Sequence, residues 1–151
     1  MEEVKFNSEN LLLPLVEARI ELVNNRLHFK GQAGNNSPVD VDYIPPLGDN
    51  LGYTSLELFL ISLATCVSSA VLPLLRKMKK EIKSLQVVAK GKRRNQHPTC
   101  FEEITLEFVL QSPDTKKEEV EKLLHLAEET YCPVWAMIKN NVKVNSQITI
   151  I

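Results

Sequence analysis

Polar and apolar residues alternate along several short segments of the chain, a period of two that predicts β-strands. Residues 17–23 and 26–33 are expected to form two strands joined at Asn24-Asn25, because asparagine tolerates the positive φ angles of a two-residue hairpin turn. Residues 39–43 alternate in the same way, and the prolines and glycines of residues 44–52 predict an ordered surface loop after them.

The second half of the chain predicts a further pair of strands, then two helices, then a closing strand. The expected elements are strands at 84–93 and 102–110, a helix from Asp114 or Thr115 to about Thr130, a helix from Pro133 to about Lys139, and a strand at 142–151. Strands and helices in this order, in 151 residues with room for one core, predict a single α+β domain that spans residues 1–151.

A long helix is expected between these two halves, over residues 54–80. Thr54 and Glu57 have the spacing of a capping box, and Pro73 is expected to kink the helix because it removes one backbone donor. Apolar residues cover nearly the whole circumference of this helix. We therefore expect it to be buried on all sides, with a second subunit covering what one thin sheet leaves exposed.

The same segment has the composition of a minimal membrane span. Residues 58–75 carry no charge, and a basic cluster follows them at residues 76–80. However, the run also contains three serines and a threonine, with Pro73 near its end and Glu57 just before its start. These polar positions favour the buried core helix of a soluble protein, so we expect no membrane contact.

Charge is balanced overall but unevenly spread along the chain. The formal net charge is −1, yet nine of the eighteen basic residues fall within residues 76–94 and nine acidic residues fall within residues 102–129. The basic stretch has no interleaved aromatic residues, as a nucleic-acid surface would. We therefore expect a basic strand that pairs with an acidic one, and no nucleic-acid partner.

Cysteine and histidine usage limits the possible chemistry further. Three cysteines, an odd number, and an acidic amino terminus where a secretory signal would be basic predict a reducing, cytoplasmic location. The three histidines are scattered along the chain, so no metal site is expected. No glycine-rich loop follows a strand, so no phosphate-bearing cofactor is expected.

Two of the cysteines are candidates for thiol chemistry. Cys132 precedes Pro133, which suits the first position of a helix, so its thiol is expected to face free backbone N–H groups that favour the thiolate. A plain capping role is the alternative. Cys66 lies in the long helix among small polar residues that leave space and hydrogen-bond donors around the sulfur, although a buried helix cysteine is usually inert. Cys100, in a turn beside Pro98, is expected to be an exposed bystander.

Several segments of the chain, taken together, resemble the OsmC/Ohr family. The segments are GYTSLELFL at 52–60, SLATCVSS at 62–69, His97-Pro98 before FEEI at 101–104, and YCPV at 131–134. The match runs in the family's order from about residue 20 to the end. Cys66 and Cys132 are 66 residues apart, close to the family's usual spacing.

The resemblance implies an intertwined homodimer with a long central buried helix, and thiol peroxidase activity without a cofactor. The thiolate that corresponds to Cys66 attacks a small organic hydroperoxide and becomes a sulfenic acid. The thiol that corresponds to Cys132 then closes a disulfide, which an external dithiol reduces. The resemblance thus assigns the attack to Cys66, whereas the residues alone favour Cys132 as the activated thiol.

The activating residues are less clearly matched. Family peroxidases use an arginine from the amino-terminal hairpin that is paired with a glutamate near the start of the long helix. Arg26 is our first candidate for this arginine, and Arg19 the second. Glu57 is the candidate glutamate, but it stands nine residues before Cys66, on the opposite face of a straight helix. Glu57 is therefore either the anchor of the arginine or only a capping residue, and the chain resembles the OsmC-like branch more than dedicated Ohr enzymes.

Two functions follow from these expectations. The first is a cytoplasmic hydroperoxide reductase that works through a Cys66–Cys132 dithiol–disulfide cycle. The alternative is a non-catalytic OsmC-like dimer that binds a small hydrophobic ligand at its interface. A cation within reach of Cys66 is the feature that would distinguish the two.

Overall fold

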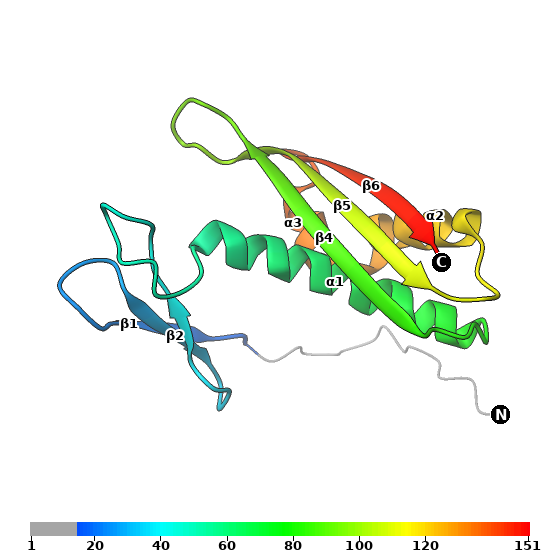
Figure 1. Cartoon of the computed structure of the whole chain (residues 1–151), viewed down its shortest axis with the longest axis horizontal. Coiled ribbons are helices and arrows are strands. Elements are labelled where there is room, and N and C mark those ends of the chain that lie inside the picture. Colours follow the sequence, from blue (N-terminus) through cyan, green and yellow to red (C-terminus); the bar gives the residue numbers. More distant parts are fainter. Residues whose placement is uncertain (1–14) are drawn as a thin grey trace. The chain divides into compact units, whose positions relative to one another are not determined.

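The computed structural model describes residues 15–151, which form two compact units that divide between Ser55 and Leu56. Figure 1 shows the elements in chain order. They are β1 (Ala18–Leu22), β2 (Phe29–Ala33), β3 (Val39–Val41), α1 (Ser55–Lys77), β4 (Ser84–Arg93), β5 (Phe101–Gln111), α2 (Lys117–Leu126), the π-helical turn η1 (Ala127–Tyr131), α3 (Pro133–Ile138) and β6 (Lys143–Ile150). The expected α+β class is confirmed.

The amino-terminal unit, residues 15–55, is built on an antiparallel sheet in the order β1-β2-β3. Its alternation gives one apolar face, on which Ile20, Gly31 and Val39 lie side by side in neighbouring strands. Ile20 remains 70% exposed within the chain, so this sheet has an apolar face that its own residues do not bury.

The turn between β1 and β2 differs from the prediction. Instead of two asparagines, residues 23–28 connect the strands, and Val23 N–H donates to the carbonyl of His28 at 2.8 Å. The side-chain oxygen of Asn24 accepts the backbone N–H groups of Arg26 and His28, at 2.9 and 3.2 Å. The asparagine thus closes a wider loop through its side chain, a local bond that the hairpin rule does not consider.

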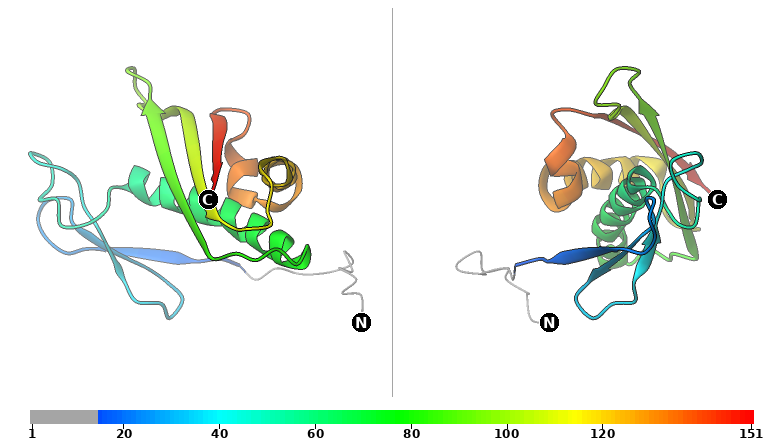
Figure 2. Two further views of the ribbon diagram at one scale, coloured as in Figure 1. Left: turned by 45° about the vertical axis from the view of Figure 1, so that its right-hand side comes forward. Right: turned by 90° about the vertical axis from the view of Figure 1, so that its left-hand side faces the viewer.

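The carboxyl-terminal unit, residues 56–151, places helices against one face of a second sheet (Figures 1 and 2). Strands β4 and β5 pair antiparallel and β6 pairs parallel to β5, in the order β4-β5-β6. The inward row of β5 is buried against a row of α1 and the apolar stripe of α2. These core residues are Ile104, Leu106, Phe108 and Leu110 of β5, Leu63, Val67, Val71 and Leu75 of α1, and Val120, Leu123 and Leu124 of α2, with Ala127.

Helix α1 begins directly after Thr54, as predicted, continues past Pro73 and ends at Lys77, three residues early. It is the one helix of the described residues that is long and apolar enough to cross a membrane by length and composition, a test that the core helix of a soluble protein also passes. Within the single chain it buries one face, and only 28% of its most apolar window is buried. The expected burial on all sides is therefore not reached by one chain.

Helix α2 starts later than predicted. The hydroxyls of Ser112 and Thr115 lie 2.6 Å apart in a buried turn, and the helix begins only at Lys117. Lys116 is its N-cap, and Glu119 accepts the backbone N–H of Lys116 at 2.8 Å. This bond from Glu119 back to the N-cap marks a start two to three residues beyond the expected position.

The expected pairing of a basic with an acidic strand is confirmed. Lys90 of β4 lies 2.6 Å from Glu107 of β5, and Lys92 lies 2.8 Å from Glu102. Both lysines occupy exposed positions of β4 that alternate with its half-buried ones, so the pairs lie on the side of the sheet away from the core. Two lysines of the basic stretch are thus paired with glutamates across the β4–β5 hairpin.

Candidate functional site

The two cysteines singled out from the sequence meet in the carboxyl-terminal unit. The Sγ of Cys132 lies 3.0 Å from the Sγ of Cys66 and donates a hydrogen bond to it, and both thiols are reduced. Cys66 comes from the middle of α1 and is partly exposed, whereas Cys132 is 2% exposed. Cys100 is exposed and belongs to the loop before β5, as expected for a bystander.

The segment before Cys132 positions its thiol. Helix α2 passes into the π-helical turn η1, and the backbone N–H of Cys132 donates to the carbonyl of Ala127 at 2.8 Å, which closes this wider turn. Cys132 is then extended, with φ −99° and ψ 100°, and Pro133 starts α3. The predicted N-cap role is confirmed, because Cys132 Sγ accepts the backbone N–H of Trp135 at 3.4 Å.

The expected activation of Cys132 was wrong in its net effect. Burial raises the pKa of the Cys132 thiol, the hydrogen bond with Cys66 raises it further, and together they bring it to about 11. The N–H groups of Trp135 and Val134 lower the pKa, as the N-cap argument predicted, but they are outweighed. Cys132 therefore keeps its proton at neutral pH.

The small polar neighbours of Cys66 do not all serve the sulfur. The hydroxyl of Thr65 donates to the carbonyls of Ile61 and Ser62, at 2.8 and 3.1 Å, and that of Ser68 donates to the carbonyl of Ala64 at 2.7 Å. These hydroxyls bond to the backbone of their own helix, a common alternative for such residues in helices. Cys132 is instead the hydrogen-bond partner of Cys66 within this unit.

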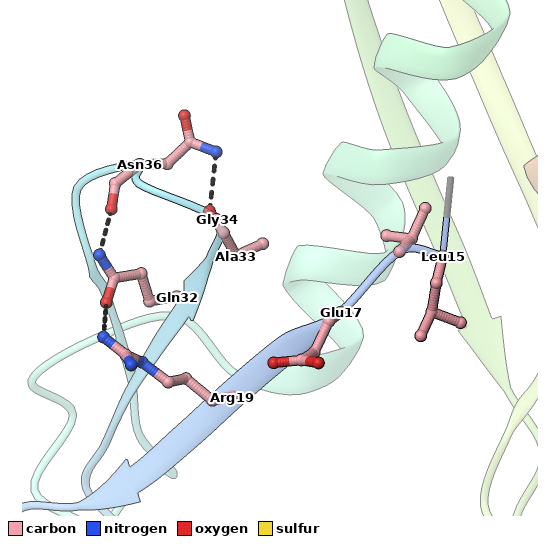
Figure 3. Close-up of a pocket in the computed structure, with 8 residues that line it drawn as sticks. Leu15, Glu17, Arg19, Gln32, Ala33, Gly34 and Asn36 are labelled. Atoms are coloured by element: carbon pink, nitrogen blue, oxygen red, sulfur yellow. Dashed lines mark hydrogen bonds between the residues drawn. The ribbon is translucent and has the colours of Figure 1, made fainter. Parts of the chain in front are cut away.

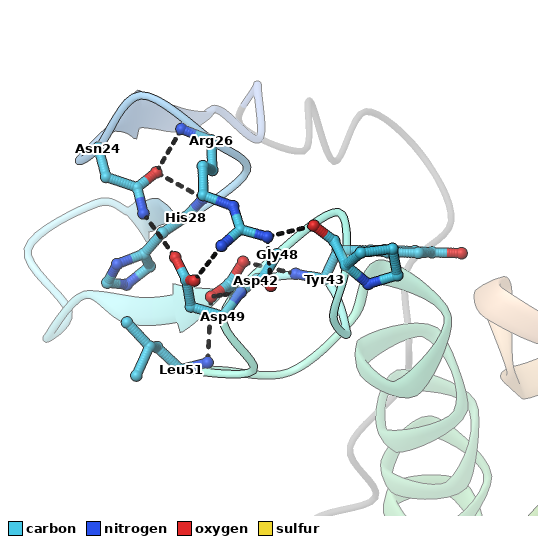
Figure 4. Close-up of polar contacts among 9 residues, drawn as sticks. Asn24, Arg26, His28, Asp42, Tyr43, Gly48, Asp49 and Leu51 are labelled. Carbon is cyan, nitrogen blue, oxygen red and sulfur yellow. Dashed lines mark hydrogen bonds and ion pairs between the residues drawn. The ribbon is translucent and has the colours of Figure 1, made fainter.

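Arg26 is held firmly within the amino-terminal unit (Figure 4). Its guanidinium lies 2.5 Å from a carboxylate oxygen of Asp49 and donates to the carbonyls of Pro46 and Gly48. Arg19, the second candidate for the activating arginine, donates to the side-chain oxygen of Gln32 at 2.6 Å. These contacts give Arg26 a structural task in residues 42–51, in addition to the activating role expected from the resemblance.

Asp42 organises the same loop from inside. Its buried carboxylate accepts the backbone N–H groups of Tyr43, Asp49 and Leu51, at 2.7, 3.2 and 3.1 Å (Figure 4). Burial raises the pKa of Asp42, but the three hydrogen bonds outweigh burial and the net pKa is lowered. Gly48 is required here, because a Cβ would lie 2.1 Å from the carbonyl oxygen of Tyr43. The predicted ordered loop is thus confirmed.

Glu57 lies in the first turn of α1 and is exposed. Its two expected roles, as anchor of an arginine and as capping residue, both remain predictions.

Two other features of the described residues gather polar or charged side chains at the surface. A shallow hollow of about 390 Å³ lies beside β1 and β2, where Arg19, Gln32 and Asn36 bond to one another and their neighbours (Figure 3). The ligand atoms of His125, Glu128 and Glu129 lie within 4.8 Å of one another, but at the surface, where acidic groups commonly gather without a metal. Neither feature includes a cysteine.

Comparison with known proteins assigns the chain to a family. Residues 48–147 match the family model described as OsmC-like protein, which is most of the chain. The chain therefore belongs to the OsmC-like protein family, as the resemblance predicted. Among curated relatives, the protein YhfA of Escherichia coli K12 is 24% identical over 136 residues, which cover 90% of this chain and 98% of YhfA.

Solved structures show the same fold. A hypothetical protein from Aquifex aeolicus VF5 matches with a TM-score of 0.76 and 27% identity, over 92% of this chain and 99% of that one. An OsmC-like protein from Vibrio cholerae matches with a TM-score of 0.78 and 17% identity, over 91% and 100%. An organic hydroperoxide resistance protein from Elizabethkingia anophelis matches with a TM-score of 0.69 and 21% identity, over 94% and 100%. Membership of this family supports a peroxide-related redox function.

The difference between the three thiols predicts their order of alkylation. With limiting iodoacetamide at pH 8, Cys100 and Cys66 should be labelled well before Cys132, because a thiol with a pKa of about 11 has only about one molecule in a thousand as thiolate at that pH. Peptide mass spectrometry gives the order. In urea the three rates should become similar, and labelling of native Cys132 as fast as Cys100 would contradict the prediction.

Proposed function

We propose that the protein is a thiol peroxidase that reduces small organic hydroperoxides through a Cys66–Cys132 dithiol–disulfide cycle. The observation that carries this proposal is the contact of the two sulfurs at 3.0 Å, between residues that are far apart in sequence. Membership of the OsmC-like family, with hydroperoxide resistance proteins among the structural neighbours, supports the choice of substrate.

The exposure of the two thiols supports their division of roles. Cys66 is partly exposed and can meet a peroxide, whereas Cys132 is 2% exposed and protonated at neutral pH. The thiolate of Cys66 attacks the terminal oxygen of the hydroperoxide, the O–O bond breaks, and the departing alkoxide takes a proton to become an alcohol. Cys66 is left as a sulfenic acid.

The second step closes the cycle. Cys132 attacks the sulfur of the sulfenic acid, an S–S bond forms, the S–O bond breaks, and the hydroxyl leaves as water once protonated. Two electrons have then passed from the two thiols to the peroxide. An external dithiol restores both thiols by exchange, and no cofactor takes part.

A non-catalytic dimer that binds a small hydrophobic ligand is the second candidate. The exposed apolar face of the β1–β3 sheet favours it, because Ile20 and Leu22 are 70% and 52% exposed within the chain. In that case the sulfur contact would be structural and the protein would not consume peroxide.

Turnover and disulfide mapping distinguish these candidates. Reduced protein given cumene hydroperoxide should consume it and form a Cys66–Cys132 disulfide with Cys100 free. Cys100→Ser should leave both results unchanged, whereas Cys66→Ser should abolish peroxide consumption. Absence of consumption by the reduced wild-type chain, or a disulfide that contains Cys100, would reject the peroxidase proposal.

We further propose that the protein is a soluble cytoplasmic homodimer in which residues 1–151 act as one domain. The one-sided burial of α1 supports this, because an apolar surface of that length is unfavourable in water. Sedimentation without detergent should give a dimer at micromolar concentration. A stable monomer, or recovery of the protein in the membrane fraction, would contradict the proposal.

The proposed activation by Arg26 can be separated from its loop contacts. Arg26→Met removes the cation, while Asp49→Asn weakens the same ion pair but keeps the guanidinium. If Arg26 activates Cys66, Arg26→Met should slow peroxide consumption about tenfold or more, and Asp49→Asn should not.

If Arg26→Met and Asp49→Asn lose thermal stability equally and neither slows peroxide consumption, Arg26 acts only in the loop. Arg19 is then the candidate for the activating arginine. Glu57→Gln completes the series: loss of rate at unchanged stability would indicate the anchor of the arginine, and loss of stability alone a helix cap.

A further inference from the structure

The thiol of Cys132 has two hydrogen-bond contacts that point in the same direction. Its Sγ accepts the backbone N–H of Trp135 at 3.4 Å, and it donates its own S–H to the Sγ of Cys66 at 3.0 Å. The three groups therefore form a short chain of hydrogen bonds, from a backbone amide through one thiol to the other.

We propose that Cys132, besides its resolving role in the proposed function on which this inference rests, stabilises the attacking thiolate of Cys66 by donating its S–H hydrogen bond to it. Hydrogen bonds to a charged acceptor are stronger than those between neutral groups, so the gain appears when Cys66 ionises. The contact from Trp135 polarises the Cys132 sulfur and makes its S–H a better donor.

Burial decides which of the two sulfurs carries the charge. Cys132 is 2% exposed, whereas Cys66 is partly exposed, and a thiolate is disfavoured where it loses contact with water. The raised pKa of Cys132 agrees with this arrangement. When the pair holds a single proton, that proton therefore lies on Cys132 and the negative charge on Cys66.

The same contact also determines when the second step can begin. While Cys66 is a thiolate, it raises the pKa of Cys132 and holds the proton there. Once Cys66 becomes a sulfenic acid, this negative acceptor is gone, so the proton of Cys132 can pass to the alkoxide or to water. The resulting Cys132 thiolate then attacks the sulfenic acid and releases hydroxide. Atoms and charge balance, because one thiol and one thiolate become a disulfide and a hydroxide while the peroxide becomes an alcohol.

Replacing the donor tests this inference directly. In a Cys100→Ser background, the rate at which iodoacetamide labels Cys66 is measured from pH 5.5 to 10 by peptide mass spectrometry. Cys132→Ser keeps a hydrogen-bond donor but cannot form a disulfide. Cys132→Ala has no donor and cannot form a disulfide either. We expect the half-maximal labelling of Cys66 to stay near that of the parent in Cys132→Ser and to move up by about one pH unit in Cys132→Ala.

A purely structural or resolving role predicts a different pattern. If the two variants give the same profile as the parent, the donor role is wrong. If Cys132→Ala unfolds, the isosteric pair Cys132→Thr and Cys132→Val makes the same comparison, because only threonine keeps a hydroxyl donor. Thermal melting of each variant shows that labelling is measured on folded protein.

The outcome does not depend on whether the protein is a peroxidase. Alkylation of Cys66 uses no peroxide, so the expected shift with no peroxide consumption would support the donor role and reject the proposed function. Consumption of peroxide with no shift would reject the donor role and leave the proposed function in place.

Discussion

The structure depends on one constraint: two sulfurs that are 66 residues apart in sequence must lie at 3.0 Å while only one of them reaches solvent. Two segments meet this constraint. Helix α1 is fixed by the row Leu63, Val67, Val71 and Leu75, which packs in the common core with the inward row of β5. The other segment runs through α2 and the turn η1. The backbone N–H of Cys132 donates to the carbonyl of Ala127, and this bond fixes the backbone of Cys132.

The N-cap position and the family resemblance had pointed to different thiols, and the hydrogen bonds reconcile them. The N–H groups at the start of α3 do face Cys132, but burial prevents that thiol from using them to ionise. They act instead on a neutral donor that faces Cys66. In the proposed cycle the attacking sulfur is in the middle of a helix, where no free backbone N–H exists, and is still linked through Cys132 to an amide at a helix start.

Much of the fold could be predicted from periodicity, and the misses have local causes. Alternation located β4 and β5, and the proline after Cys132 located the start of α3, because each of these signals lies within a few residues. The turn after β1 was missed because the side chain of Asn24 replaces backbone partners. The start of α2 was missed because a buried turn at Ser112 and Thr115 uses the residues that looked like a cap.

The candidate site was harder to predict because it is made by contacts between distant segments. The sequence indicated Cys66 and Cys132 separately, and their spacing resembled that of a known family, but no local signal gives the exposure of either sulfur. Burial outweighed the lowering of the Cys132 pKa that the N-cap position alone implied. Likewise, the hydroxyls around Cys66 looked like donors to the sulfur, yet those of Thr65 and Ser68 bond to their own helix.

A thiol donor also has a consequence for reactivity that a guanidinium would not have. A neutral S–H stabilises a thiolate less than a cation does, so it lowers the pKa of the thiol less strongly. However, the nucleophilicity of a thiolate falls as its pKa falls, and the best attacking thiol has a pKa near the ambient pH. Modest stabilisation therefore keeps more of the intrinsic reactivity of each thiolate while still raising the thiolate fraction. In the proposed cycle the residue that gives this modest stabilisation is also the one that attacks next, so activation and resolution would depend on the same 3.0 Å contact.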